Sequence, residues 1–217
     1  MDKRYDYILF DLDGTVTDSK PGIIRCIKYA LDTKGISYDN AILDKMVGPP
    51  FRVSMHDYLG LEMDVIEELI KLYRGEYESG GWRECEVYAG VVEMFDALKA
   101  AGKHLAIATS KPIKFTNMMI DGLGLRKYFD FVGGATNDAS KEAKCDVVEL
   151  VLNNLGVTDR SRALMVGDRL FDIEGAHICG IDCAAIMWGY GNIEEFEEYK
   201  ADHIIDTPRN VVKLITG

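Results

Sequence analysis

The sequence predicts an α/β protein in which a doubly wound parallel sheet carries an inserted all-helical domain. Two observations predict this fold class. Short apolar runs that end in small or polar residues recur along the chain, and amphipathic segments with helical spacing separate most of them. Between the first and the second of these runs, residues 19–88 contain helical patterns and no convincing strand.

Five apolar runs are the predicted strands, and the first extends from Tyr7 to Phe10 without a polar break. The others span residues 105–108, 129–132, 164–166 and 183–187. The predicted helices are the amphipathic segments at 90–103, 112–124 and 145–156. Because strands that alternate with helices form a parallel sheet, we expect helices on both of its faces.

The interval without strands divides the chain into a core and an insertion. We expect residues 1–18 and 89–217 to form a catalytic core, and residues 19–88 to form a helical cap domain. In an open parallel sheet, ligands bind outside the carboxyl ends of the strands. Polar side chains that directly follow the predicted strands are therefore the candidates for a functional site.

Composition argues against several classes of partner. The formal net charge of −11 opposes binding to nucleic acid polymers, but it does not exclude a small anionic substrate. No apolar run approaches the roughly 18 residues that a spanning helix needs, so no membrane segment is expected. The five cysteines form no CxxC pair and the four histidines are scattered, which argues against zinc and favours reduced thiols in the cytoplasm.

Carboxylates gather at two predicted strand ends. Asp11 and Asp13 directly follow the first predicted strand, and Asp168 follows the fourth, with Asp172 four residues further on. An aspartate after a strand is often only the N-cap of the next helix. Carboxylates that converge on one edge, however, repel one another unless a cation neutralises them. An oxygen-only cluster of this kind suits Mg²⁺.

Two other ligand-binding loops are excluded. In a calcium loop of the EF-hand type, the fifth, sixth and twelfth positions would here be Thr15, Val16 and Gly22, which do not match. The chain also has no GxxxxGK[ST] segment, so it is not a P-loop kinase.

Further polar residues follow the second predicted strand and precede the third predicted helix. Thr109 and Ser110 come at the end of that strand, and Lys141 and Lys144 stand just before that helix. Taken singly, the hydroxyls would be capping groups and the lysines would be solvated. Beside four aspartates at strand ends, they become candidate ligands of an anion.

Four motifs follow one another on this βα framework: "DLDGT", "ATSK", a lysine and "GDRLFD". In them the chain resembles the haloacid dehalogenase superfamily, and more narrowly its helical-capped branch of phosphoglycolate phosphatases and 5′-nucleotidase-like phosphatases. The resemblance spans essentially the whole chain, including the insertion. It implies a Mg²⁺-dependent phosphomonoester hydrolase that acts through an aspartyl-phosphate on a small phosphorylated metabolite, as a monomer or weak homodimer.

The resemblance also implies a role for each aspartate. Asp11 would be the nucleophile, and Asp13 would be the general acid and base. All four aspartates would belong to the Mg²⁺ site, with Asp13 contributing its backbone carbonyl. Asp168 would bind the ion directly, and Asp172 would bind it or orient it through its neighbours.

The phosphoryl group would be bound by Thr109, Ser110 and Lys144, and Lys144 would also neutralise the nucleophile. The corresponding lysine of the family often precedes a proline, which neither Lys141 nor Lys144 does. We select Lys144 because it directly adjoins the predicted helix, and Lys141 is the alternative.

In the insertion, Arg52 follows the rigid turn Gly48-Pro49-Pro50. The helical-capped branch has its substrate-specificity loop at this place. Arg52 would therefore hold a carboxylate or a second phosphate of the substrate through bidentate hydrogen bonds. The alternative is an exposed arginine at the start of a helix.

Two other functions stay open. A sugar-phosphate mutase shares Asp13, although its first motif usually has valine where this chain has Thr15. A catalytically silent binding protein on the same fold is the second alternative. The complete set of aspartate, threonine and lysine speaks against it, since a binding module needs no second aspartate.

Overall fold

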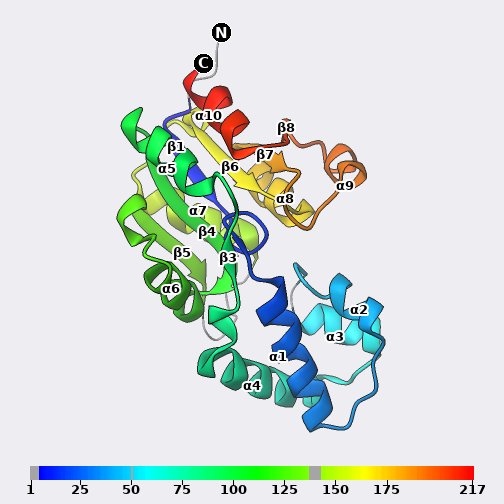
Figure 1. Cartoon of the computed structure of the whole chain (residues 1–217). Coiled ribbons are helices and arrows are strands. Elements are labelled where there is room, and N and C mark those ends of the chain that lie inside the picture. The colour runs from blue at the N-terminus through cyan, green and yellow to red at the C-terminus, as the bar shows by residue number, and fades with distance from the viewer. Residues whose placement is uncertain (1–4, 50, 137–142) are drawn as a thin grey trace. The chain divides into compact units, whose positions relative to one another are not determined.

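The computed structural model describes residues 5–49, 51–136 and 143–217. The chain forms two compact units, Met1–Asp18 together with Val87–Gly217, and Ser19–Glu86 (Figure 1). The sequence predicts the second boundary after residue 88 rather than after 86. Tyr88 is tied to the first unit, because its backbone N–H donates a hydrogen bond to the carbonyl oxygen of Val16 (3.1 Å).

Within the described ranges, the main sheet of the first unit has six strands: β1 (Tyr7–Phe10), β4 (His104–Pro112), β5 (Phe131–Ala135), β6 (Ala163–Gly167), β7 (Asp182–Ile186) and β8 (His203–Ile205). Neighbouring strands are parallel, in the order β5-β4-β1-β6-β7-β8. The chain thus runs outward from β1 in both directions, which confirms the predicted doubly wound class. The carboxyl end of β1 lies at the topological switch point. Two short strands, β2 (Thr17–Asp18) and β3 (Glu86–Val87), form a separate sheet.

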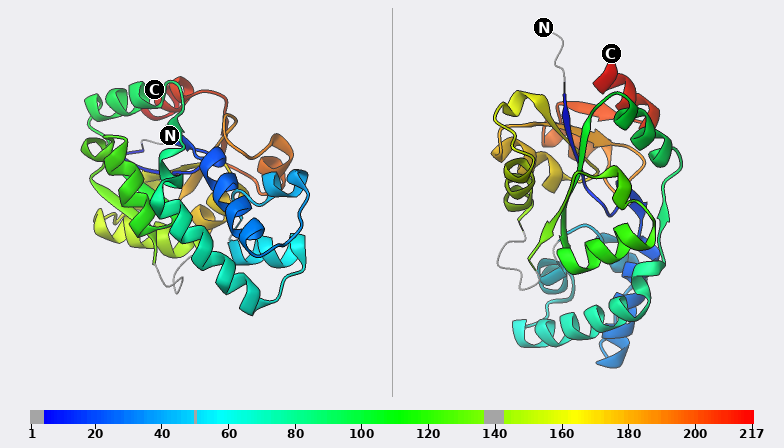
Figure 2. Two further views of the ribbon diagram at one scale, coloured as in Figure 1. Left: turned by 60° about the horizontal axis from the view of Figure 1, so that its bottom comes forward. Right: turned by 90° about the vertical axis from the view of Figure 1, so that its left-hand side faces the viewer.

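Helices cover both faces of the large sheet (Figure 2). They are α5 (Val91–Ala100), α6 (Ile113–Gly122), α7 (Lys144–Asn154), α8 (Leu170–Ile178), α9 (Ile193–Glu198) and α10 (Pro208–Thr216). Helices α7 and α8 pack together on one face, and α5 and α10 on the other. Between the sheet and the α7–α8 pair, the core includes the fully buried side chains of Leu9, Val148 and Ile173.

The register of the central strands aligns their carboxyl ends. Phe10, the last residue of β1, pairs with Ile107 of β4 and with Val166 of β6. Residues that follow these partners therefore come to one edge of the sheet.

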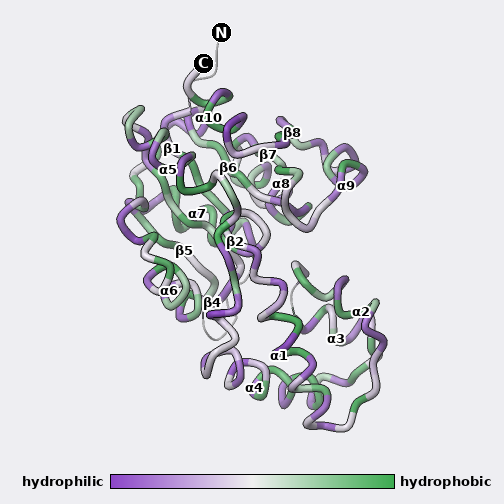
Figure 3. Tube along the Cα trace, viewed as in Figure 1, coloured by the Kyte–Doolittle hydropathy of each residue, from purple (hydrophilic) through white to green (hydrophobic). Residues whose placement is uncertain are grey.

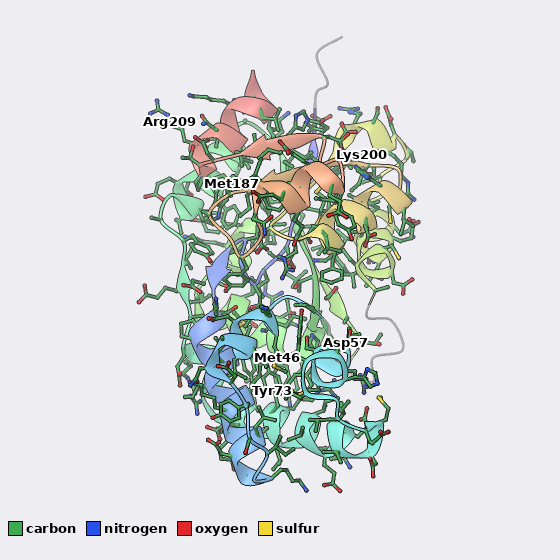
Figure 4. The ribbon with its side chains drawn as sticks, turned by 90° about the vertical axis from the view of Figure 1, so that its right-hand side faces the viewer. Met46, Asp57, Tyr73, Met187, Lys200 and Arg209 are labelled. Carbon is green, nitrogen blue, oxygen red and sulfur yellow. The ribbon has the colours of Figure 1, made fainter. Side chains whose placement is uncertain are left out.

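The described residues of the second unit form four α-helices, α1 (Lys20–Thr33), α2 (Asn40–Lys45), α3 (Phe51–Leu59) and α4 (Met63–Ser79), and a short 3₁₀ helix at Gly81–Arg83. Hydrophobic and hydrophilic stretches alternate along these helices (Figure 3), as expected for helices with one buried face. The unit has a core of its own, which includes Ile27, Leu31 and Leu69. Met46 and Tyr73, labelled in Figure 4, also belong to or pack against this core.

Some elements differ from the prediction. β5 begins two residues later than predicted and continues through Gly133 and Gly134, a residue type that carries no strand signal. α6 begins at Ile113, because Pro112 still belongs to β4 and is the N-cap. β8, α9 and α10 were not predicted. Across the described ranges, no helix is both long enough and apolar enough to cross a bilayer.

Candidate active site

Three of the predicted carboxylates meet at the edge of the sheet. Asp11 directly follows β1, Asp168 directly follows β6, and Asp172 lies in the first turn of α8. One carboxylate oxygen of each lies within 4.8 Å of the other two. Asp168 and Asp172 are buried, and only 13% of the Asp11 side chain is exposed. The fold thus concentrates negative charge in a space with little water.

Lys144, the first residue of α7, brings an ammonium group into this cluster. Its Nζ lies 2.8 Å from Asp11 Oδ1 and 2.7 Å from Asp172 Oδ1, and it donates a hydrogen bond to the carbonyl oxygen of Ala108 (3.1 Å). Burial disfavours the charged ammonium, but the attraction of Asp11 and Asp172 outweighs it and raises the pKa of Lys144. The lysine therefore stays charged.

One ammonium does not neutralise three carboxylates. Burial raises the pKa of Asp11 to about 6, although Lys144 opposes this change and a hydrogen bond from Thr109 opposes it further. Burial, followed by repulsion from Asp172 and Asp11, raises the pKa of Asp168 well above its usual range. Among the residues that the structure describes, the cluster is short of positive charge, and its donors are all oxygens. These residues fit a hard divalent cation.

A loop and a turn hold Asp168 in place. The hydroxyl of Thr15 donates to Asp168 Oδ1 (3.0 Å), and the backbone N–H of Tyr190 donates to Oδ2 (2.8 Å). Gly14, at φ +85°, leaves the room for this carboxylate, since a Cβ there would lie 2.2 Å from Asp168 Oδ2. Trp188, in the same loop as Tyr190, joins that loop to the turn after β1 through a hydrogen bond from its Nε1 to the carbonyl oxygen of Thr15 (3.0 Å). Trp188 and Tyr190 were not predicted as site residues.

Asp172 uses its two oxygens differently. Oδ2 accepts hydrogen bonds from the backbone N–H groups of Asp168 (3.1 Å) and Arg169 (3.0 Å), at the start of α8. Oδ1 contacts Lys144. Asp172 therefore fixes both the turn that carries Asp168 and the position of the lysine.

The carboxylate of Asp13 lies outside the three-carboxylate cluster and is paired instead with Lys111, whose Nζ is 2.9 Å from Oδ2. A metal contact from Asp13 through its backbone carbonyl stays a prediction.

Thr109 is buried and hydrogen-bonded to Asp11, whereas Ser110 is half-buried in the strand beside it. Lys111 was missed as a site residue. Its place directly after Thr109 and Ser110, at a strand end facing Asp13, is the signal that could have found it.

Arg52 and Lys141 are the two remaining candidates. Arg52 lies on α3 in the second unit, where its Nε is 2.6 Å from Glu67 Oε1. Its contact with a substrate stays a prediction. Lys141, the alternative to Lys144, and Pro50 of the predicted turn lie outside the described residues.

Comparisons with known proteins agree with this geometry. The sequence profile of haloacid dehalogenase-like hydrolases matches residues 8–186. The chain is 34% identical over 206 residues to the tyrosine-protein kinase PtkA of Mycobacterium tuberculosis, across 94% of this chain and 67% of that protein. It is 32% identical over 201 residues to a 5′-nucleotidase of Pseudomonas aeruginosa, across 92% and 90% of the two chains. The crystal structure of a "predicted phosphatase" from Clostridium acetobutylicum has 34% identity and a TM-score of 0.93, covering 98% of this chain and 99% of that one.

A doubly wound sheet with strand-end carboxylates at its switch point and a helical insertion after β1 defines a class of α/β enzymes. The chain belongs to the haloacid dehalogenase-like hydrolases. The predicted family and the predicted enzyme class, a phosphatase of this superfamily, are confirmed.

Proposed function

We propose that this chain is a Mg²⁺-dependent phosphomonoester hydrolase that acts through an aspartyl-phosphate on a small phosphorylated metabolite. The proposal rests on the buried ammonium of Lys144, which lies between Asp11 and Asp172 at the carboxyl end of β1. A phosphoryl group at this point would meet a nucleophile, a fixed cation and the hydroxyl of Thr109 together.

Asp11 is the proposed nucleophile. One of its carboxylate oxygens forms a bond to phosphorus while the bond from phosphorus to the ester oxygen breaks, which gives the aspartyl-phosphate. Lys144 offsets the negative charge of the phosphoryl oxygens, and Thr109 donates a hydrogen bond to one of them. Water then attacks phosphorus, inorganic phosphate leaves, and Asp11 is a free carboxylate again.

Asp13 is the proposed carrier of the proton. The leaving ester oxygen needs a proton in the first step, and the attacking water must lose one in the second. A carboxyl group two residues beyond the nucleophile can supply the first proton and take up the second. After one full turnover Asp13 is protonated again.

Mg²⁺ would be held by Asp11, by Asp168 and by the backbone carbonyl of Asp13, with Asp172 contributing directly or through its hold on Lys144 and the turn. When bound, the ion supplies positive charge that reduces the repulsion between the nucleophile and the phosphoryl group. The excess of carboxylates over ammonium groups, counted over the described part of the chain, supports this assignment.

Hydrolysis of p-nitrophenyl phosphate with and without Mg²⁺ tests the proposal. We expect turnover with Mg²⁺, a loss of at least about 100-fold after chelation with EDTA, and recovery when Mg²⁺ is returned. Mg²⁺ should also raise the Tm of the free enzyme, because it binds the folded cluster. Turnover that is indifferent to chelation would exclude the metal. Conversion of sugar phosphates without release of inorganic phosphate would favour the mutase.

Phosphoglycolate and nucleoside 5′-monophosphates are the substrates that we propose first. The resemblance of the motifs supports both, and the name of the Pseudomonas aeruginosa relative supports the second. A panel of phosphorylated metabolites, ranked by kcat/KM, would identify the substrate class. If the folded protein releases phosphate from none of these metabolites and not from p-nitrophenyl phosphate, the catalytically silent binding protein is the remaining alternative.

Replacement of the proton carrier should depend on the leaving group. Asp13→Asn is expected to lower kcat about 100-fold or more for an alkyl ester such as glycerol 3-phosphate, whose alkoxide needs a proton. It should lower kcat for p-nitrophenyl phosphate far less, since that leaving group needs little protonation. The ratio of the two rates is the measurement. Equal losses on both esters would remove Asp13 from the acid role.

Arg52→Ala tests the specificity residue. We expect kcat/KM to fall about 10- to 100-fold for a substrate with a second anionic group, and hardly at all for p-nitrophenyl phosphate. Glu67→Gln is the matched control, because it breaks the same ion pair and keeps the arginine. If Glu67→Gln has the same effect as Arg52→Ala, then the ion pair supports the second unit and Arg52 does not bind substrate.

A further inference from the structure

The strand β4 carries a bulge directly at the site. Its ladder with β5 pairs Thr109 with Gly134, and the next pair is Pro112 with Ala135. Ser110 and Lys111 are therefore extra residues on β4 that no residue of β5 faces. Bulges bend a strand and re-aim its side chains. Here the bulge directs the side chain of Lys111 toward Asp13, in the turn that follows the neighbouring strand β1.

The surroundings of the bulge are built to hold it. The backbone N–H of Lys111 donates to Thr109 Oγ1 (3.3 Å), and its carbonyl oxygen accepts from Thr116 Oγ1 (3.2 Å). Gly134 lets the bulge approach, since a Cβ there would lie 2.8 Å from the carbonyl oxygen of Lys111 and 3.0 Å from the Cα of Ile113. Hydrogen bonds to the backbone N–H and to the carbonyl oxygen of Lys111 thus fix the backbone from which its side chain extends.

The ammonium of Lys111 contacts both oxygens of one carboxylate. Its Nζ lies 2.9 Å from Asp13 Oδ2 and 3.2 Å from Oδ1. The lysine side chain is 6% exposed and that of Asp13 is 20% exposed. A buried ammonium is costly unless it is paired. Two contacts to one carboxylate, from a side chain with little freedom, fix the orientation of that carboxylate.

We propose that Lys111 is the positioning residue of Asp13: it holds the carboxylate in the orientation from which the proton is delivered to the leaving oxygen and taken from water. This inference rests on the proposed function, because it assigns no chemistry to Lys111 itself. Proton transfer needs the donor and acceptor oxygens within hydrogen-bond distance and in line. A carboxylate free to rotate would meet that requirement for a smaller fraction of the time.

The test is Lys111→Met, assayed on glycerol 3-phosphate and on p-nitrophenyl phosphate. We expect kcat to fall about 10- to 100-fold on the alkyl ester and less than about 3-fold on the nitrophenyl ester, since positioning is a part of what general acid–base catalysis contributes. In the Asp13→Asn background the same substitution should have no further effect on the ratio of the two rates. Non-additivity of this kind shows that Lys111 acts through Asp13.

Lys103→Met is the matched control. Lys103 precedes β4 at the opposite end, is also buried, and also pairs with an aspartate, Asp6, at 3.3 Å. Its replacement removes a buried ammonium of the same kind, and it should leave the ratio of the two rates unchanged. If Lys111→Met does not fold, Lys111→Gln, which keeps a hydrogen-bond donor without the charge, is measured in the same way and should show the same selective loss.

The outcomes separate the two proposals. If the wild-type enzyme hydrolyses neither ester, the proposed function fails, and the role of Lys111 fails with it. If the wild type is active but Lys111→Met lowers both rates equally, or lowers neither, only the positioning role is overturned. If the double variant loses additional activity selectively on the alkyl ester, Lys111 acts independently of Asp13 and the inference is wrong.

Discussion

Asp11→Asn is expected to abolish turnover while the fold stays intact. The amide keeps the shape of the carboxylate but cannot attack phosphorus, so kcat should fall by more than about 100-fold, or roughly 2.7 kcal/mol of activation free energy. The loss should be the same for alkyl and nitrophenyl esters, because both need the nucleophile. Initial rates on the two esters are the measurement.

The same variant should bind substrate and remain folded. Asn removes one of three mutually repelling carboxylates, and Lys144 keeps its contact with Asp172. We therefore expect little change in Tm. A second check is trapping: after brief incubation with substrate and acid quenching, the wild type should carry a phosphoryl group on the peptide that contains Asp11, and the variant should not. Residual kcat above about one hundredth of the wild-type value would contradict covalent catalysis by Asp11.

Lys144→Met should also have a large effect, and unlike Asp11→Asn it should affect both activity and stability. The ammonium joins Asp11 to Asp172 and also caps the carbonyl of Ala108. Without it, the carboxylates of Asp11 and Asp172 lose the lysine contact that the described residues give them. Breaking a buried ion pair in this way costs about 3 to 5 kcal/mol of folding free energy. We expect a loss of kcat of about 1000-fold and a lower free energy of unfolding in urea, partly restored by Mg²⁺.

Lys103→Met again provides the comparison, because it removes a buried lysine that pairs with Asp6, which lies at the opposite end of β1 from Asp11. The Lys103→Met variant should have a lower free energy of unfolding than the wild type and an unchanged kcat. If Lys144→Met retained more than about a tenth of the wild-type kcat, the lysine that binds the phosphoryl group would be the alternative, Lys141, and Lys141→Met should then show the loss.

The local sequence pattern was enough to predict a strand and its site residue wherever an apolar run stopped directly at a carboxylate. The run from Tyr7 to Phe10 is apolar and stops at a carboxylate, so both β1 and the place of Asp11 followed from the sequence. Strand β6 and Asp168 followed in the same way. Because carboxyl ends of parallel strands meet at one edge, the proximity of Asp11 and Asp168 could be predicted without knowing the strand order.

What the sequence could not provide is long-range register. The bulge that aims Lys111 at Asp13 depends on how β4 pairs with β5, and the glycine-rich β5 has no pattern that fixes this pairing. Trp188 holds the turn after β1 through the carbonyl oxygen of Thr15, from a loop more than 150 residues away, and Tyr190 of the same loop holds Asp168. Such contacts have no local signature, since they arise only when the sheet has formed.

The position of β1 in the middle of the sheet also has a consequence for how the enzyme acquires its activity. Asp11 lies near the start of the chain, and the groups that complete its surroundings, Lys144 and Asp168, come from the second half. During synthesis Asp11, the proposed nucleophile, is made before both partners, so a chain that has not yet formed β6 lacks the complete carboxylate cluster. Pairings between distant segments form late and close large loops. We therefore expect a chain that ends before β6 to lack the assembled site, and with it the activity of the complete protein.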